Sequence, residues 1–462
     1  MEYLYEKLTA YGNSDYYAFH MPGHKRNMEL MRARLPYNID ITEIDGFDDL
    51  HHAEELLKEL QENAARVFHA EETHYLVNGS TVGLLSAVMG CTERGGRILM
   101  ARNCHKSVYN AVYINELRPV YIYPEFSEET DLNGEIHVDQ IKKLLEEYED
   151  IQAVVIVSPT YEGVVSDIEA IAEIVHEYKI PLIVDEAHGA HFGFHSYFPQ
   201  NANTRGADVV IHSLHKTLPC FTQTAILHVK GKLVDQDRVS RYLSMFQTSS
   251  PSYLFMAGME RCIWYMDGDG RNEMVRYEER LEHFMKRMEG LQVLEVLDWE
   301  ICRKYRTVAG WDPSKIVVST MRAEDFHGEE LAETLRRKYH LEMEMTAPEY
   351  VIAMTSLMDT EEGFERLGTA LLEIDGALRH CVESEQQKEK GESKGKKRCE
   401  TPEATESKVS HPIRRMLICE AMDADTERTA LQDTVGKVSA EFVYLYPPGI
   451  PIIAPGEVFT DV

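Results

Sequence analysis

Short apolar runs alternate with amphipathic helical patterns along the first half of the chain. Val, Ile and Leu dominate these runs, which are typical of buried strands and occupy residues 75–77, 97–100, 119–123, 151–157, 181–184, 208–212 and 223–229. Helical patterns separate most of them, as at residues 138–148 and 168–178. Strands that alternate with helices predict an α/β fold with a mostly parallel sheet of seven strands. Only a short loop separates the last two runs, so we expect one of those two strands to run antiparallel.

The pattern changes beyond residue 251. Two helices are predicted at residues 253–267 and 272–288. Shorter strands and helices then alternate, at residues 293–298, 315–319, 328–339, 350–354 and 360–381. This alternation predicts a second, smaller α/β domain. Residues 1–60 predict a helix, a polar and aromatic loop and another helix.

Residues 384–410 carry almost no large apolar side chains. Because such a segment cannot offset its ordering entropy by burial, it is predicted to be a disordered linker. Two short amphipathic pieces, at residues 413–421 and 431–439, and a proline-rich run follow it. We therefore expect an N-terminal segment with a large domain at 1–265, a small α/β domain at 266–383, the linker at 384–410 and a small C-terminal domain at 411–462.

Composition narrows the class of protein. The 462 residues suffice for two or three domains, and a hydrophobic content of 44% is typical of a globular protein. A formal charge of −30 argues against a nucleic-acid partner or an anionic membrane. No apolar run reaches the roughly 18 residues of a membrane span, and no signal-peptide pattern is present, so a cytoplasmic location is expected. The eight cysteines form no CxxC pair, which fits free thiols in a reducing compartment and argues against structural zinc.

Two ionisable residues follow buried strands of the predicted sheet. Asp185 ends one apolar run, and Lys216 lies where the next strand gives way to a loop. Proteins of the α/β class bind ligands at such strand ends. The turn Gly79-Ser80-Thr81, between a strand and a helix, is typical of an anion site at a helix N-terminus. A lysine for a Schiff base, an acid for a pyridine nitrogen and a phosphate site are what pyridoxal phosphate requires. Taken alone, Asp185 could equally cap a helix and Lys216 could lie on the surface.

Three further residues extend this hypothesis. His105 follows a predicted strand, and its flat ring could stack on the cofactor, although a capping or surface role fits the local sequence equally well. Ser213 and His215 flank Lys216 closely enough to add donors for the phosphate.

A metal site is the alternative interpretation of the histidines His188, His191 and His195, which lie close to Glu186 in the sequence. Their spacing is not that of the i, i+4 histidine pair with an intervening glutamate that characterises helical zinc sites. No metal is therefore predicted.

Nine motifs, taken in order, resemble the ornithine/lysine/arginine decarboxylase family of fold type I pyridoxal phosphate enzymes, in its short biosynthetic form. They are FHMPGHK (19–25), DITEIDGFDDL (40–50), NGST (78–81), ARNCHKS (101–107), SPTYEGV (158–164), DEAHGAH (185–191), SLHKTLP (213–219), TSSPSYL (248–254) and YPPGIPIIAPGE (446–457). They cover both ends of the chain, and the middle of the small domain is the least recognisable part.

The resemblance implies a homodimer or larger homo-oligomer with active sites at the subunit interface. It implies that Lys216 forms the Schiff base, that Asp185 pairs with the ring nitrogen and that His105 stacks on the ring. The other cofactor contacts that it implies are Gly79, Ser80, Thr81, Ala187, His188, Ser213 and His215. Ser250 or Ser252 would reach the site of the neighbouring subunit.

The implied reaction converts a basic amino acid to its amine and carbon dioxide, which would feed polyamine biosynthesis. Arginine is the favoured substrate, then lysine, then ornithine. The acid that meets the substrate's cationic end could be Asp45, Asp48 or Glu457, each of which could equally be a capping or surface acid, and His24 is a further candidate contact.

Two departures from the family pattern concern the substrate more than the cofactor. Ala53-Glu54-Glu55 stands where the family has Pro-Glu-Gly, and Asp45 stands where it has proline. Two alternatives also remain open: an aminotransferase or carbon–carbon lyase of the same fold, and a regulatory relative without turnover.

Overall fold

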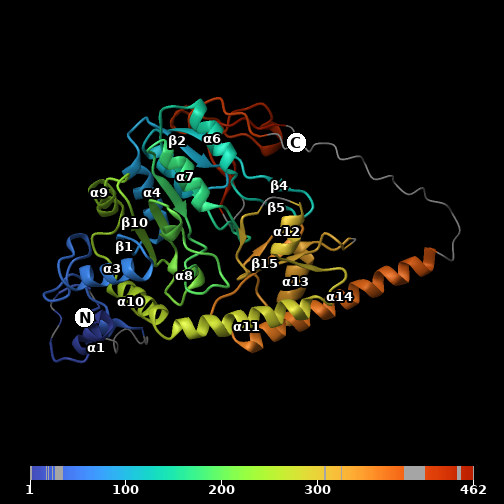
Figure 1. The fold of residues 1–462 in the computed structure, drawn as a ribbon, viewed down its shortest axis with the longest axis horizontal. Helices are drawn as coiled ribbons and strands as arrows, with labels where there is room; N and C mark the ends of the chain where they lie inside the picture. Colours follow the sequence, from blue (N-terminus) through green and yellow to red (C-terminus); the bar gives the residue numbers. More distant parts are fainter. Residues whose placement is uncertain are drawn as a thin grey trace. The chain divides into compact units, whose positions relative to one another are not determined.

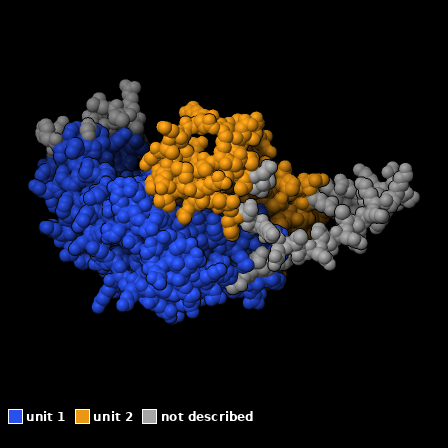
Figure 2. All heavy atoms as spheres, turned by 90° about the horizontal axis from the view of Figure 1, so that it is seen from above, with its two compact units in different colours: residues 1–281, 298–315, 354–359 blue, residues 282–297, 316–353, 360–462 orange. Residues whose placement is uncertain are grey.

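The computed structural model describes residues 3–16, 18, 20–22, 24–26, 35–305, 308–323, 325–389, 411–444 and 449–460. Parts of two motifs, residues 19 and 23 and residues 446–448, lie outside the described residues. The chain divides into two compact units (Figure 2). Unit 1 takes Met1–Leu281, Asp298–Lys315 and Met354–Asp359, and unit 2 takes Glu282–Leu297, Ile316–Ala353 and Thr360–Val462.

Unit 1 is built on the predicted sheet of seven strands, in the order β1-β10-β9-β8-β6-β2-β3. The strands are β1 (Glu72–Leu76), β2 (Arg97–Ala101), β3 (Arg118–Ile122), β6 (Ile151–Val157), β8 (Leu182–Asp185), β9 (Val209–His212) and β10 (Ala225–Val229). All neighbours from β9 to β3 pair in parallel, whereas β10 pairs antiparallel with both β9 and β1. The prediction of a mostly parallel sheet with one antiparallel strand among the last two is therefore confirmed.

Helices cover this sheet and bury its central strands, as expected for a parallel sheet (Figure 1). The helices of unit 1 include α1 (Leu4–Gly12), α3 (Leu56–Val67), α4 (Gly79–Cys91), α5 (Lys106–Ile114), α6 (Val138–Glu147), α7 (Ile168–Glu177), α8 (Leu214–Thr217), α9 (Gln236–Phe246) and α10 (Tyr253–Asp267). Helix α4 packs across five strands, with α5 and α9 packed on it. Such close packing needs small residues: a Cβ at Gly83 would lie 2.8 Å from Leu76 Cδ1, and one at Gly90 would lie 2.5 Å from Val239 Cγ2.

Shorter elements complete unit 1. They are the 3₁₀ helices η1 (Tyr37–Ile39), η2 (Leu50–His52) and η3 (Ala202–Arg205), the helix α12 (Trp299–Tyr305), and the strand pairs β4 (Phe126–Ser127) with β5 (Leu132–Asn133) and β7 (Val164–Val165) with β12 (Gly310–Trp311). Helix α11 (Gly270–Met288) runs through the point where the chain leaves unit 1.

Unit 2 contains a four-stranded sheet in the order β11-β13-β15-β14. Its elements are β11 (Glu295–Leu297), β13 (Lys315–Ser319), α13 (Gly328–Tyr339), β14 (Met345–Thr346), β15 (Tyr350–Met354), α14 (Glu361–Glu389), α15 (Ile418–Met422), η4 (Leu431–Asp433), β16 (Val443–Tyr444) and β17 (Pro451–Ile453). Helix α14 includes residues 384–389 of the segment assigned above to a linker, and residues 390–410 lie outside the described residues.

Some elements differ from the sequence prediction. Helices α5 and α9 were not predicted, and Lys216 lies in the short helix α8 rather than in a loop. Tertiary packing explains α5 and α9, since both lie against α4. The amphipathic piece predicted at 431–439 is helical only over η4. In the part of the chain that the structure describes, no helix is long and apolar enough to cross a bilayer.

Candidate functional site

Lys216 and His188 meet at the carboxyl ends of the central strands. Lys216 Nζ lies 2.8 Å from His188 Nε2. His188 is 8% exposed, and burial together with the charges of Lys216 and Lys315 holds the pKa of His188 well below its ordinary value. His188 is therefore neutral near pH 7. When Lys216 is an ammonium it can only donate, so the proton of the neutral imidazole lies on Nδ1.

Asp185 is the last residue of β8 and lies in the same cluster. It is 5% exposed, and Oδ1 accepts a hydrogen bond from Ala187 N at 3.2 Å. Burial raises the pKa of the Asp185 carboxyl, against the charge of Lys216, which lowers it. Ala187, itself predicted to contact the cofactor, thus binds Asp185 through its backbone N–H, and its contact with the cofactor stays a prediction. A buried carboxyl group whose hydrogen bond from the protein is long is typical of a functional site.

The N-terminus of α4 brings hydroxyl groups to this edge of the sheet. Gly79 begins the helix with φ +76°, a conformation that favours glycine. Ser213 Oγ donates to Ser80 Oγ at 2.9 Å, so the turn is joined to the segment that carries Lys216. Asn78, the N-cap residue, makes no capping bond to the helix, and its Oδ1 accepts from Thr248 N instead. The first N–H groups of α4 are therefore suited to an anionic group.

His105 is joined to the same turn through Ser107. His105 Nδ1 caps helix α5 by accepting Ser107 N at 3.2 Å, and it lies 2.7 Å from Ser107 Oγ. That hydroxyl also lies 3.3 Å from Thr81 Oγ1. Burial, with the charges of Lys216 and Lys106, lowers the pKa of His105 to about 4. The ring is neutral at physiological pH, and it has the capping role that the sequence left open.

His215 uses one ring nitrogen within its own segment. Its Nδ1 lies 2.8 Å from Thr224 O, and since a carbonyl can only accept, Nδ1 carries the proton. Burial lowers the pKa of His215, against the Thr224 hydrogen bond. A phosphate contact through Nε2 stays a prediction.

The buried ion pair of Lys315 with Asp312 contacts His188. Lys315 Nζ lies 2.8 Å from Asp312 Oδ2 and donates to His188 O at 3.3 Å. Asp312 Oδ1 lies 3.0 Å from His191 Nε2. Burial acts to raise the pKa of Asp312, but Lys315 and His191 outweigh it and lower that pKa far below its usual range. Tyr161 packs on His188, with ring centroids 4.6 Å apart.

The three histidines considered as metal ligands contact different partners. His188 contacts Lys216, His191 contacts Asp312, and His195 Nδ1 lies 3.5 Å from Glu278 Oε2.

Three of the predicted substrate residues make hydrogen bonds within their own parts of the chain. Asp48, with φ +64°, accepts backbone hydrogen bonds from residues 49, 54, 55 and 57, which is a capping role. His24 Nε2 lies 3.1 Å from Asp40 Oδ2, and Asp45 is exposed. In unit 2, Glu457 is fully buried and accepts Ala454 N at 2.8 Å. The substrate roles of these residues stay predictions.

Ser250 and Ser252 lie in the segment that follows α9. Ser250 is exposed, and its backbone N donates to Thr248 Oγ1 at 3.2 Å. Ser252 is the N-cap residue of α10 but makes no side-chain capping bond. Because Thr248 is bonded to Asn78, this segment starts beside the α4 turn. Contact with a neighbouring subunit stays a prediction.

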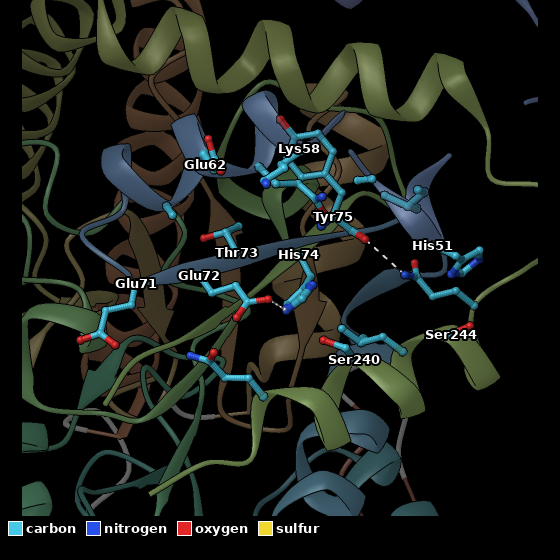
Figure 3. A pocket seen from close by; sticks show the side chains of 17 residues that line it. His51, Lys58, Glu62, Glu71, Glu72, Thr73, His74, Tyr75, Ser240 and Ser244 are labelled. Carbon is cyan, nitrogen blue, oxygen red and sulfur yellow. Dashed lines mark hydrogen bonds and ion pairs between the residues drawn. The ribbon is translucent and has the colours of Figure 1, made fainter. Parts of the chain in front are cut away.

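A separate cavity of about 600 Å³ lies along the outer edge of β1, between α3 and α9 (Figure 3). Its wall includes Lys58, Glu62, Glu72, His74 and Ser240. None of the predicted site residues lines it. The outer edge of β1 is also bonded to glutamine side chains: Tyr75 N donates to Gln61 Oε1, and Gln247 Nε2 donates to Tyr75 O.

The residues at the carboxyl ends fit pyridoxal phosphate. The α4 N-terminus with its hydroxyls would hold the phosphate, Asp185 the ring nitrogen, and Lys216 the aldehyde carbon. His188 Nδ1 is buried and has no hydrogen-bond partner among the described residues, which leaves a donor for a ligand. An orphaned buried donor is rare in proteins without such a reason.

Comparison with protein families decides the class. The model described as "Orn/Lys/Arg decarboxylase, major domain" matches residues 3–328, and the one described as "Orn/Lys/Arg decarboxylase, C-terminal domain" matches residues 413–462. The chain belongs to the Orn/Lys/Arg decarboxylase family. The prediction of a fold type I amino acid decarboxylase is thereby confirmed at the level of the family.

Individual members of this family align along nearly the whole chain. The arginine decarboxylase of Halalkalibacterium halodurans is 30% identical over 99% of this chain and 91% of its own length. That of Bacillus subtilis is 31% identical, with the same coverage. The constitutive lysine decarboxylase of Escherichia coli is 23% identical over 98% of this chain and 74% of its own length.

Solved structures confirm the fold. The lysine decarboxylase LdcF of Francisella novicida superposes with a TM-score of 0.80 at 19% identity, covering 99% of this chain and 75% of that one. An alanine–glyoxylate aminotransferase from Nostoc reaches a TM-score of 0.55 at 15% identity, covering 68% of this chain and 85% of that one. The family's fold thus extends over both units.

Four residues of the site were missed by the sequence prediction: Ser107, Tyr161, Asp312 and Lys315. Ser107 and Tyr161 lie within quoted motifs, ARNCHKS and SPTYEGV, so the signal for these two was present. Nothing in the local sequence marks Asp312 and Lys315, because the buried partners that define them are His188 and His191.

Proposed function

We propose that this chain decarboxylates a basic amino acid to its amine, with pyridoxal phosphate held on Lys216. The observation that carries the proposal is the meeting of Lys216, Asp185 and the α4 N-terminus at one edge of the sheet. When bound, pyridoxal phosphate supplies an electron sink for cleavage of a bond at the substrate α-carbon.

The chain's own residues would bind and orient. Asp185 would hold a proton on the ring nitrogen, which is the charge that makes the ring an electron sink. His105, neutral and largely buried, would lie against the ring without adding charge. Ser80 Oγ and Ser213 Oγ, already bonded to each other, would meet the phosphate. His188 would keep Lys216 Nζ in place beside the reacting carbon.

Arginine is the substrate that we favour, before lysine and ornithine. The arginine decarboxylases of two species are 30–31% identical to this chain, against 23% for a lysine decarboxylase. Among the candidate acids, Asp48 is disfavoured because four backbone N–H groups already use its carboxylate. The amine product would enter polyamine biosynthesis, and the enzyme would act as a homodimer or larger assembly in the cytoplasm.

One experiment tests the cofactor. Purified protein is mixed with pyridoxal 5′-phosphate, free cofactor is removed, and the visible absorbance of cofactor linked to the protein as a Schiff base is recorded for the wild type, Lys216→Ala and Lys230→Met. Lys230 is a matched control because it follows β10 at the opposite edge of the sheet, where Nζ donates to Asn203 O at 2.9 Å. We expect the absorbance in the wild type and Lys230→Met, and its loss in Lys216→Ala. Absorbance that persists in Lys216→Ala would contradict the proposal.

A second experiment tests the reaction. Carbon dioxide release from arginine, lysine and ornithine is measured with the loaded enzyme, together with any keto acid product. Release from arginine without a keto acid supports the proposal. A keto acid would indicate an aminotransferase, and no turnover of any of the three would indicate a regulatory relative.

A further inference from the structure

A second set of buried polar side chains lies behind the site. It forms a chain of hydrogen bonds across four adjacent strands, from Thr73 on β1 through His228 on β10 and His212 on β9 to Glu186, which follows β8. The atoms are Thr73 Oγ1 and His228 Nδ1 at 2.7 Å, His228 Nε2 and His212 Nδ1 at 3.0 Å, and His212 Nε2 and Glu186 Oε2 at 2.6 Å. All four residues are 3% exposed or less.

The chain of hydrogen bonds lies on the face of the sheet opposite Asp185. Asp185 pairs with Ile211, and side chains alternate between the two faces of a strand. His212 and Glu186 therefore point away from the side on which Asp185 lies. Glu186 directly follows Asp185, and His212 directly precedes Ser213. The hydrogen bond between His212 and Glu186 thus ties together the two backbone segments that carry Asp185 and Ser213.

The aromatic ring of Phe68 packs against both histidines of this chain of hydrogen bonds. The ring centroid of Phe68 lies 5.3 Å from that of His212 and 5.0 Å from that of His228. In such an apolar layer, a polar group without a partner is costly. Burial lowers the pKa of His228 well below its ordinary value, so this ring is neutral. Glu186 also accepts Ala202 N at 3.1 Å, which gives its carboxylate a second donor.

We propose that His212 and Glu186 are positioning residues for cofactor binding. Their hydrogen bond fixes the ends of β8 and β9, and with them the separation between the Asp185 carboxylate and the Ser213 hydroxyl. Ring nitrogen and phosphate are separate parts of one rigid ring system, so the groups that hold them must be placed correctly at the same time. The inference rests on the proposed function.

The fold offers a matched control for a purely structural role. His176 Nε2 lies 2.8 Å from Asp208 Oδ2, which also accepts Leu182 N at 2.8 Å. This contact joins the same two strands at their amino ends, because Leu182 begins β8 and Asp208 directly precedes β9. A histidine–carboxylate contact there stabilises the sheet without touching the site.

The test measures the cofactor Kd and the thermal midpoint of the apoprotein. The proteins are the wild type, His212→Gln, Glu186→Gln, their double variant and His176→Gln. We expect His212→Gln and Glu186→Gln each to raise the Kd about tenfold or more, as outer partners of ligating groups do. The cofactor Kd of the double variant should be no higher than that of the single variant that binds more weakly, because the two residues act through one contact. His176→Gln should lower the midpoint and leave the Kd within about twofold of the wild type.

One outcome overturns the proposal: His212→Gln lowers the midpoint while its Kd stays within twofold of the wild type. A wild type that binds no pyridoxal phosphate contradicts the proposed function instead, before any variant is compared. The two failures are therefore distinct.

A milder pair of variants covers the case in which His212→Gln does not fold. Thr73→Val removes only the hydroxyl at the far end of the chain of hydrogen bonds, and Thr73→Ser keeps it. Thr73→Val should raise the Kd about threefold, and Thr73→Ser should match the wild type. His74→Gln is the adjacent control, since His74 pairs with Glu72 on the other side of β1 (Figure 3). An unchanged Kd in both Thr73→Val and Glu186→Gln overturns the proposal.

Discussion

Asp185 and Asp208 stand at opposite ends of the same two strands, and both are buried, at 5% and 4% exposed. Burial raises the pKa of each carboxyl. Their partners differ. Asp208 accepts Leu182 N and contacts His176, both at 2.8 Å, whereas Asp185 accepts a longer bond of 3.2 Å from Ala187 N and faces the charge of Lys216.

This difference separates structural acids from functional ones. Where the fold itself supplies close donors, an acid stabilises the strands that it joins. Where the hydrogen bonds to the acid are long and a lysine at a strand end supplies the nearby charge, the acid is available to a ligand. Burying that acid then lowers the stability of the protein. The following substitutions test this distinction, beginning with the largest expected effect.

Asp185→Asn should abolish most activity and cost the apoprotein little stability. Decarboxylation should fall by roughly 10³-fold, because an amide cannot keep the ring nitrogen protonated. A raised carboxyl pKa in the folded state means that stability falls as pH rises above the unfolded pKa, so a neutral amide removes this loss. Turnover and urea unfolding at pH 7 measure the two effects.

Asp208→Asn is the control at the other end of the strands, and it should behave in the opposite way. We expect a loss of about 1–2 kcal/mol in the free energy of unfolding, because the amide weakens the close contacts of Asp208 with His176 and Leu182 N, with turnover within about twofold of the wild type. A large loss of turnover in Asp208→Asn would break the comparison.

Lys315→Met should destabilise the protein by about 3–5 kcal/mol, because it leaves Asp312 charged, buried and without its cation. Urea unfolding of the apoprotein measures the loss. Lys315→Met combined with Asp312→Asn should recover part of it, since the uncompensated charge is then gone. If the double variant is as unstable as the single one, packing rather than charge dominates at this position.

His105→Phe should remove part of the acid sensitivity of the apoprotein. The pKa of His105 is about 4 in the folded protein and near 6.5 when unfolded, so protonation favours the unfolded chain as pH falls from 6.5 towards 4. This contribution amounts to roughly 2 kcal/mol at pH 5. The difference in unfolding free energy between pH 7 and pH 5 should be smaller in His105→Phe by that amount. An unchanged difference would show that the ring is already solvated.

Asp48→Asn gives the smallest effect and asks whether Asp48 is structural or contacts substrate. Burial acts to raise the pKa of Asp48, but backbone hydrogen bonds outweigh it and lower the pKa. Its stabilisation is therefore present above the unfolded pKa and is lost as pH falls through the folded one. We expect a loss of about 1 kcal/mol at pH 7 with KM unchanged. A large rise in KM would instead place Asp48 at the substrate.

The sequence predicted the parts of the site that lie in local patterns. Asp185, Lys216 and the turn at Gly79 each follow an apolar strand, and strand ends in a parallel sheet meet at one edge. The contacts between these parts could not be predicted. Lys216 meets His188 across 28 residues, and Ser213 meets Ser80 across 133, because only strand order decides which loops become neighbours.

The sequence alone therefore determined two features. Its hydrophobic periodicity indicated seven strands, one of them antiparallel, and the order of its motifs indicated the family to which the chain belongs. Which buried polar side chains form hydrogen bonds with one another was decided by the tertiary structure. Nothing near Thr73 in the sequence indicates His228, and nothing near Lys315 indicates His188. Hydrophobic periodicity records which face of an element is buried, whereas a buried hydrogen bond depends on the register between strands that the chain brings together only on folding.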